Sequence, residues 1–172
     1  RRFCSWAGLV REAIERGDIG EPRVVAHYGN CSLMHNHVHS IDTISYLLGD
    51  PGIVAVRGEL HPRDLKIEDN HLAEDPRATF HIVFANGVEA YSVPAGPVET
   101  EVIGTENSIR ASNTLDGSEA TVHLRAASGG ERRPVWKLIA VPPIPGGSSV
   151  VACLEDLVDS YESGRPSRAN IE

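Results

Sequence analysis

Three of the eight histidines in the chain lie within five residues, in the run 35–42 (HNHVHSID). The backbone conformation decides which chemistry these histidines can support. In an extended segment, the rings of His35, His37 and His39 all point to one side, which suits a metal site. In a helix that begins at His35, only His35 and His39 share a face. That second geometry suits a catalytic pair, because imidazole titrates near neutral pH.

Three hypotheses follow for this cluster. The first is a metal-dependent hydrolase or lyase, which would need further ligands beside the three histidines. The sequence offers four side chains for that role: Asp42, Asp69, His71 and Asp75. The second is a set of surface or locally hydrogen-bonded histidines without a catalytic role. The third is acid/base catalysis at the start of a helix, whose positive end favours the neutral, proton-accepting imidazole. We favour the third hypothesis and expect no bound metal ion.

Other catalytic patterns are absent from the sequence. It contains no GxSxG nucleophile elbow, no phosphate-binding P-loop and no GxGxxG turn. The acidic pairs Glu68-Asp69 and Glu74-Asp75 are typical of a solvated loop. The histidine run is therefore the strongest indication of chemistry.

Composition limits the kinds of protein and partner. The chain has 172 residues, 41% of them hydrophobic, which suits one soluble domain with a sizeable core. Its formal charge of −8, without a basic cluster, argues against nucleic acid as a partner. We expect no membrane partner, since no apolar run approaches the ~20 residues of a membrane span. Three widely spaced cysteines predict neither a disulfide framework nor a thiolate zinc site, and we expect a cytoplasmic location.

The elements that must position the histidines follow from periodicity. Apolar residues at helical spacing predict a first helix over 6–14, with Ser5 as its cap and Gly17 at its end. A strand follows over 23–28. The next helix is expected over about 40–48, directly after the histidines, with Asp42 in its first turn, where the helix dipole favours a carboxylate.

The rest of the chain is dominated by predicted strands. They cover residues 53–60, 78–85, 88–93, 98–103, 108–112, 120–125 and 135–141, and a helix over 149–162 closes the chain. Asn86-Gly87 predicts a type I′ hairpin turn. The result is one α+β domain over 1–172, with a mixed, mainly antiparallel sheet of about six strands and helices on one face. Both faces of strand 78–85 carry apolar residues, which predicts a further subunit on the open face.

The whole chain resembles the C-terminal domain of the Gfo/Idh/MocA oxidoreductases. Five segments carry the resemblance in the family's order: the first helix and its RGDIG end, HSIDTISYLLG, the hairpin ATFHIVFANGV, IGTENSI and the closing LEDLV. The resemblance implies the fold of the C-terminal domains of dihydrodipicolinate reductase and glyceraldehyde-3-phosphate dehydrogenase. His35 and His37 stand where the family often has an acidic and a small residue.

The resemblance implies that His39 is the catalytic base for a sugar or polyol hydroxyl, whose carbon gives hydride to NAD or NADP. We expect His35, His37, Asn36 and Arg2 to contact the substrate. Asp42 is expected to have a structural role near the site.

The resemblance also implies an absent nucleotide-binding half. In the family, a Rossmann domain before Arg1 holds the dinucleotide and supplies a lysine, and the chain continues beyond Glu172. We therefore expect this chain to be a fragment that binds no cofactor and is inactive alone. Its open sheet face would form a homodimer or homotetramer. A non-catalytic interaction domain is the alternative in which that face is the whole function.

Overall fold

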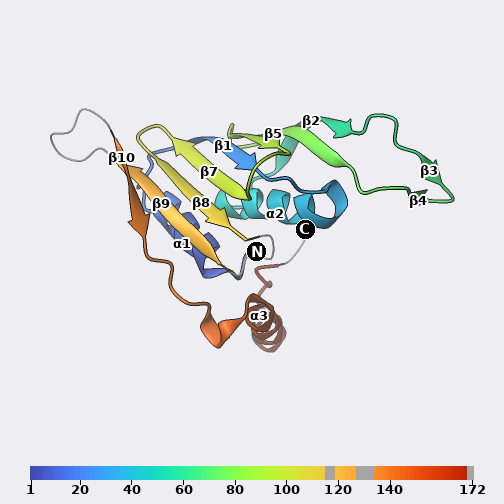
Figure 1. Ribbon diagram of the computed structural model, residues 1–172. Helices are drawn as coiled ribbons and strands as arrows, with labels where there is room; N and C mark the ends of the chain where they lie inside the picture. Colours follow the sequence, from blue (N-terminus) through green and yellow to red (C-terminus); the bar gives the residue numbers. More distant parts are fainter. Residues whose placement is uncertain (115–118, 127–133, 170–172) are drawn as a thin grey trace.

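The computed structural model describes residues 1–114, 119–126 and 134–169 (Figure 1). The helical segments are α1 (Ser5–Glu15), η1 (Leu33–His37), α2 (Val38–Leu47), η2 (Pro145–Gly147) and α3 (Ser149–Ser163). The strands are β1 (Pro22–Tyr28), β2 (Ile53–His61), β3 (Ile67–Glu68), β4 (His71–Leu72), β5 (Arg77–Phe84), β6 (Glu89–Val93), β7 (Glu99–Gly104), β8 (Ser108–Asn113), β9 (Ala120–Ala126) and β10 (Val135–Ile139).

Eight strands form one twisted sheet in the order β10-β9-β8-β7-β1-β6-β5-β2. Strands β1 and β6 pair in parallel, and each of the other neighbours in this order pairs antiparallel. The α+β class and the mixed, mainly antiparallel sheet are therefore confirmed, with eight strands in place of about six. The short β3–β4 pair, which the sequence did not predict, extends as an arm beyond the sheet (Figure 1).

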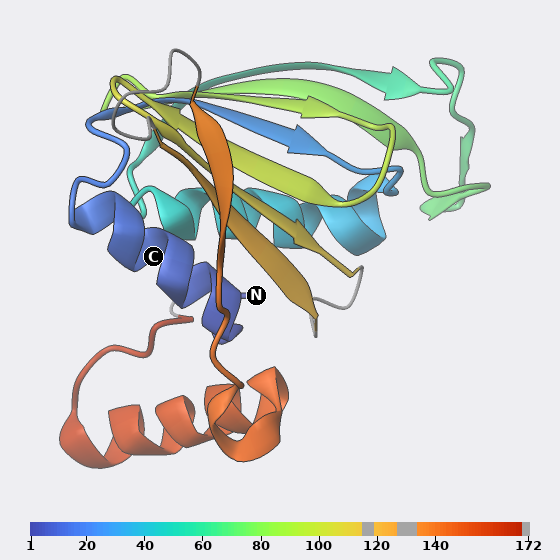
Figure 2. The same ribbon diagram turned by 60° about the vertical axis from the view of Figure 1, so that its left-hand side comes forward.

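Helices α1 and α2 lie on the same side of the sheet (Figure 2). Alternation along β5 buries Ala78, Phe80, Ile82 and Phe84 toward these helices, because successive side chains of a strand point to opposite faces. The helices contribute their own apolar stripes to the same core. From α1 these are Trp6, Ala7, Val10 and Ala13, and from α2 they include Ile44 and Leu47.

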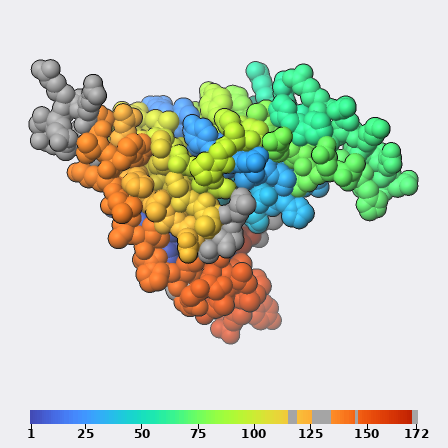
Figure 3. Space-filling model, viewed as in Figure 1, coloured from blue at the N-terminus to red at the C-terminus, as the bar shows by residue number. Residues whose placement is uncertain are grey.

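Helix α3 extends the helical layer beyond the sheet and forms a separate lobe (Figures 2 and 3). Its two buried residues, Asp156 and Ser160, are polar. Asp156 is 4% exposed and accepts hydrogen bonds from Arg165, Ser167 and Arg168. The apolar side of α3, including Leu154, is exposed. Among the described residues, no helix is long and apolar enough to cross a membrane.

The β5–β6 hairpin forms where the sequence predicted it, but the type I′ turn is wrong. Gly87 has a φ of 81°, whereas Asn86 does not have a positive φ, which a type I′ turn requires at both central residues. The Asn86 side chain instead accepts a hydrogen bond from the backbone N–H of Val88 (3.2 Å). Phe84 and Gly87 close the loop through a backbone hydrogen bond of 2.9 Å.

Within the part of the chain that the structure describes, the other face of the sheet carries no helix and mixes ion pairs with exposed apolar side chains. Arg110 bonds Glu101 at 2.7 Å and also lies 3.3 Å from Glu99. Tyr91 and Val93 are about two-fifths exposed on the same face. The further subunit on this face stays a prediction, and the exposed apolar side chains are the surface that it would cover.

A matched pair of glycine substitutions tests the packing between β7 and the α1–β1 connection. A Cβ added at Gly104 would lie 2.1 Å from the carbonyl oxygen of Ile19, whereas one at Gly8 in α1 would meet nothing within 4 Å. We expect Gly104→Ala to lower the free energy of unfolding by about 1–3 kcal/mol. Gly8→Ala should raise it by about 0.5–1 kcal/mol. Urea unfolding of both variants checks this, and equal effects would contradict the described packing.

Candidate functional site

The histidine run is helical throughout. The π-helical turn η1 continues directly into α2, so the helix begins before His35 rather than at residue 40. His37 starts the core-facing stripe that continues through Ser40, Ile44 and Leu47, while His35 and His39 are exposed. The three rings therefore do not converge. Within the described ranges, no group of three or more His, Cys, Asp or Glu side chains is placed to hold a metal ion.

His37 is a fully buried ring that packs without a hydrogen bond. Its side chain is 0% exposed and lies edge-on to Phe80, with the ring centroids 5.2 Å apart. Neither of its ring nitrogens has a partner among the described residues. Burial lowers the pKa of His37, because a charged imidazolium would lose its hydration. His37 is thus a neutral packing residue, and direct substrate contact would require the core to open.

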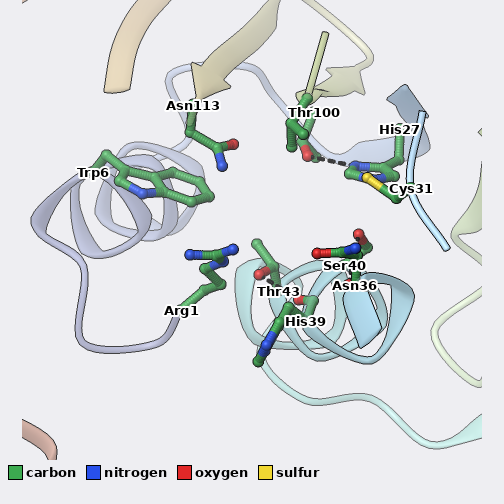
Figure 4. Close-up of a pocket in the computed structure, with 11 residues that line it drawn as sticks. Arg1, Trp6, His27, Cys31, Asn36, His39, Ser40, Thr43, Thr100 and Asn113 are labelled. Carbon is green, nitrogen blue, oxygen red and sulfur yellow. Dashed lines mark hydrogen bonds between the residues drawn. The ribbon is translucent and has the colours of Figure 1, made fainter. Parts of the chain in front are cut away.

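A polar pocket lies at the N-terminal part of α2, between that helix, α1 and the sheet (Figure 4). It encloses a cavity of about 20 Å³. The lining residues are Arg1, Trp6, His27, Cys31, Asn36, His39, Ser40, Thr43, Val98, Thr100 and Asn113. The pocket thus brings together His39 and Asn36 of the predicted site, and it leaves out His35, His37, Arg2 and Asp42.

His39 lies at the rim of this pocket, with its ring directed outward from the cavity (Figure 4). Burial and the Arg1 guanidinium lower the pKa of His39, and Asp42 opposes them. The imidazole is therefore neutral near pH 7, which is the state that can accept a proton.

The sequence offered Asp75 only as a further ligand in the metal hypothesis and did not predict its contact with the histidine turn. It was predicted to lie in a solvated acidic loop, but it accepts hydrogen bonds from the backbone N–H groups of Met34 (2.9 Å) and His35 (3.0 Å). Its carboxylate also lies 3.3 Å from Nδ1 of His35. Although burial acts against it, these hydrogen bonds lower the pKa of Asp75. Asp75 thus caps the turn that carries the histidines, a role that local sequence pattern cannot show because the loop is 40 residues away.

Arg2 and Asp42 bond each other outside the pocket. The Arg2 guanidinium donates to Asp42 at 2.8 Å and also pairs with Asp50 at 2.6 Å. Asp42 is the fifth residue of α2, because the helix begins at Val38. The predicted first-turn contact with the helix dipole is therefore wrong. The structure places Asp42 in a structural ion pair, and the arginine that lines the pocket is Arg1.

No protein-family model and no curated protein matches the sequence. Solved structures match its fold. An aldose-aldose oxidoreductase from Caulobacter crescentus, complexed with glycerol, superimposes with a TM-score of 0.74 at 18% identity, over 97% of this chain and 53% of that chain. Levoglucosan dehydrogenase, in complex with NADH and L-sorbose, gives 0.72 at 18% identity, over 99% of this chain and 57% of that one.

A super-repressor mutant of Gal80p from Saccharomyces cerevisiae also shares the fold, with a TM-score of 0.66, 11% identity and coverage of 98% of this chain and 52% of that chain. The chain thus spans about half the length of the structures it matches. It has the fold of the C-terminal part of Gfo/Idh/MocA-type oxidoreductases, as the sequence resemblance implied.

Asp75 and its neighbour Glu74 provide a matched test of the cap. Asp75→Ala removes the acceptor of two backbone N–H groups, so we expect the free energy of unfolding to fall by about 1–2 kcal/mol. Hydrogen exchange at Met34 and His35 should become faster at the same time. Glu74→Ala changes an exposed carboxylate in the same loop and should leave both measurements unchanged. Equal behaviour of the two variants would show that Asp75 is not the cap.

Burial also makes stability depend on pH through His27. Its side chain is 2% exposed, and burial, followed by the nearby His37, lowers its pKa from 6.5 to about 4. Between about pH 6.5 and pH 4, His27 therefore binds a proton in the unfolded chain but not in the folded chain. We expect the free energy of unfolding to fall by roughly 3 kcal/mol through this window, at about 1.4 kcal/mol per pH unit.

Urea unfolding of the wild type and of His27→Gln, at about pH 7 and about pH 4.5, measures this dependence. The variant has no titrating group at this position and should lose less stability on acidification. If both proteins lose the same amount, His27 is not the responsible group.

Proposed function

We propose that this chain is the substrate-binding and oligomerising domain of an NAD- or NADP-dependent oxidoreductase that acts on a sugar, a polyol or a related hydroxy compound. His39 is the catalytic base, and Asn36 and Arg1 line the same pocket. The proposal includes the expectation from the sequence that a nucleotide-binding domain belongs to the same parent protein. We include a cytoplasmic location in this proposal.

The placement of a neutral histidine at the rim of a polar pocket is the observation that carries the proposal. A base that removes a proton from a hydroxyl group must be unprotonated and must reach that hydroxyl. His39 meets the first condition through its environment, and its exposed ring is open to a ligand. The fold neighbours that were solved with glycerol and with L-sorbose support hydroxylated compounds as the ligand class.

The connection from β1 to η1 does not fit a dinucleotide. Such a cofactor needs a strand, a glycine-rich turn and a helix N-terminus. The connection from β1 to η1 is Gly29-Asn30-Cys31-Ser32. The sulfur of the buried Cys31 lies 2.9 Å from the position that a Cβ on Gly29 would take, so it occupies the space beside this glycine. We therefore assign cofactor binding to the parent protein outside this chain. The role of this chain is confined to substrate binding and to proton acceptance by His39.

The second candidate is a non-catalytic interaction domain. The specific observation in its favour is the shared fold with Gal80p, a protein described as a transcriptional regulator in the structure from a second yeast. The helix-free sheet face, with its ion pairs and exposed Tyr91 and Val93, would then be the functional surface. For both candidate functions, we propose that this face forms the contact of a homodimer or homotetramer.

Replacement of His39 in the complete parent separates these candidates. If His39 is the base, His39→Ala should lower kcat for polyol oxidation by about 10²–10⁴-fold. The control is His71→Ala, which removes another exposed histidine from the β3–β4 arm and should leave kcat unchanged. Unchanged oxidation by His39→Ala would favour the non-catalytic candidate.

The absence of a cofactor site in this chain has its own test. We expect isothermal titration of NADH into the 172-residue chain to show no saturable binding. Titration into the complete parent is the positive control. A micromolar Kd for the chain alone would contradict the assignment of the dinucleotide to another part of the protein.

A further inference from the structure

Strand β2 forms one edge of the sheet and has a strand neighbour on one side only. It pairs with β5, and the sheet order places no other described strand beyond it. Residues 53–60 of this strand are exposed throughout. Figure 2 shows β2 as the uppermost strand of the sheet. The backbone N–H and C=O groups that point away from β5 are therefore open to a further strand.

The regular part of β2 lacks the features that usually keep an edge strand from pairing with another chain. Proteins commonly place lysine, proline, a bulge or a covering segment at such an edge. The ladder between β2 and β5 shifts its register between Ile53 and Ala55 and then runs without interruption over 55–61. This segment (AVRGELH) contains no lysine and no proline. Its open edge can therefore accept a second strand along its whole length.

The same segment is complementary to itself in an antiparallel arrangement centred on Gly58. When Gly58 of one copy faces Gly58 of another, Val56 faces Leu60. In this register Arg57 faces Glu59, and two-fold symmetry makes each pair occur twice. Gly58 is the middle residue of the uninterrupted ladder, so this register pairs all of that ladder with its copy.

The apolar pair lies where the hydrophobic core ends. Val56 and Leu60 are beside Ile82 and Ala78 of β5, which are buried under the helical layer. Val56 and Leu60 themselves are 62% and 40% exposed, so the helices do not cover this last row of the sheet. Directly opposite side chains of an antiparallel pair are in contact. A second copy would thus bury Val56 against Leu60 at two places.

The charged pair lies on the other face of β2. Arg57 has no ion pair within the ranges that the structure describes. Glu59 lies 2.6 Å from Arg63 of its own chain, but its side chain is 56% exposed, and a carboxylate can accept from a second guanidinium. Like charges that face each other across two strands are repulsive, and opposite charges are attractive. The two charges of β2 have opposite signs and flank Gly58 at equal spacing, so this register attracts a second copy.

We infer that β2 binds β2 of a second copy of this chain, antiparallel and centred on Gly58, so that two sheets join edge to edge. This contact is separate from the helix-free sheet face, and it does not depend on the proposed function. One pair of short strands is a small interface, and small interfaces bind weakly. The association therefore depends on the concentration of the chain.

Hydrogen exchange of the 172-residue chain over a concentration series, measured by peptide mass spectrometry, tests the contact. Exchange over 55–61 should slow as the concentration rises, because the outward N–H groups gain partners. Strand β10, at the other edge, is the internal control. It carries Lys137 at its middle, a charge that would face itself in a symmetric pair, so its exchange should not change.

The same measurement separates this contact from the one assigned to the sheet face. Association face to face would leave the outward N–H groups of β2 open, even if the chain sediments as a dimer. Slower exchange over 55–61 in a chain whose sheet face stays free would support the edge contact alone. Exchange over 55–61 that is the same at every concentration overturns the inference, and a strand of a different protein would then be the partner to test at this edge.

Charge reversal tests the register. Arg57→Glu and Glu59→Arg each place like charges opposite each other at two points, so each should raise the concentration of half-maximal protection about tenfold. The double variant restores opposite charges and should stay within about twofold of the wild type. Arg23→Glu makes the same change of charge in β1, an interior strand, and should have no effect. Equal behaviour of Arg57→Glu and Arg23→Glu, or a double variant that stays as weak as the single ones, would contradict this register.

Discussion

The burial of His37 determines how the helix that carries the histidines sits on the sheet. Its ring lies edge-on to Phe80 of β5 and 6.2 Å from the ring of His27 in β1. Because His37, Ser40, Ile44 and Leu47 form one stripe, burying the first also fixes the rotation of α2 about its own axis. His39, two positions further on, is thereby turned out of the core. The capping bonds from Asp75 hold the preceding turn in place.

The same packing separates two chemical environments. On the core side, His27 and His37 lose hydration and stay neutral, so no fixed positive charge forms beneath the pocket. At the rim, His39 keeps access to solvent, with Arg1 near enough to lower its pKa. The rim of the pocket thus presents an exposed, neutral imidazole. Under the proposed function, this imidazole is the base for a hydroxylated compound, while another part of the protein carries the redox chemistry.

Much of the fold was predictable from the sequence, because period-two and helical patterns are local. The hairpin over Arg77–Val93, the later strands and α3 all lie close to their predicted places. The histidine run was ambiguous, since its sequence was compatible with both an extended and a helical backbone. Distant contacts support the helix: His37 packs against Phe80, and Asp75 accepts hydrogen bonds from the Met34 and His35 N–H groups. Asp75 and Thr100 act through contacts 40 and 73 residues away in the chain, which no local pattern reveals. The turn at Asn86 differs because Asn86 has no positive φ, and its side chain instead accepts a hydrogen bond from the N–H of Val88.

The central claim is that the helix places the neighbouring histidines in opposite environments. Modification of the native chain with diethyl pyrocarbonate, followed by peptide mass spectrometry, measures the reactivity of each imidazole. The structure predicts rapid modification of His35 and His39, which are exposed, and protection of His37, which is 0% exposed. Unfolding in urea should remove that protection. If His37 reacted in the native chain as fast as His35, the described packing of the helix, and the pocket that depends on it, would be contradicted.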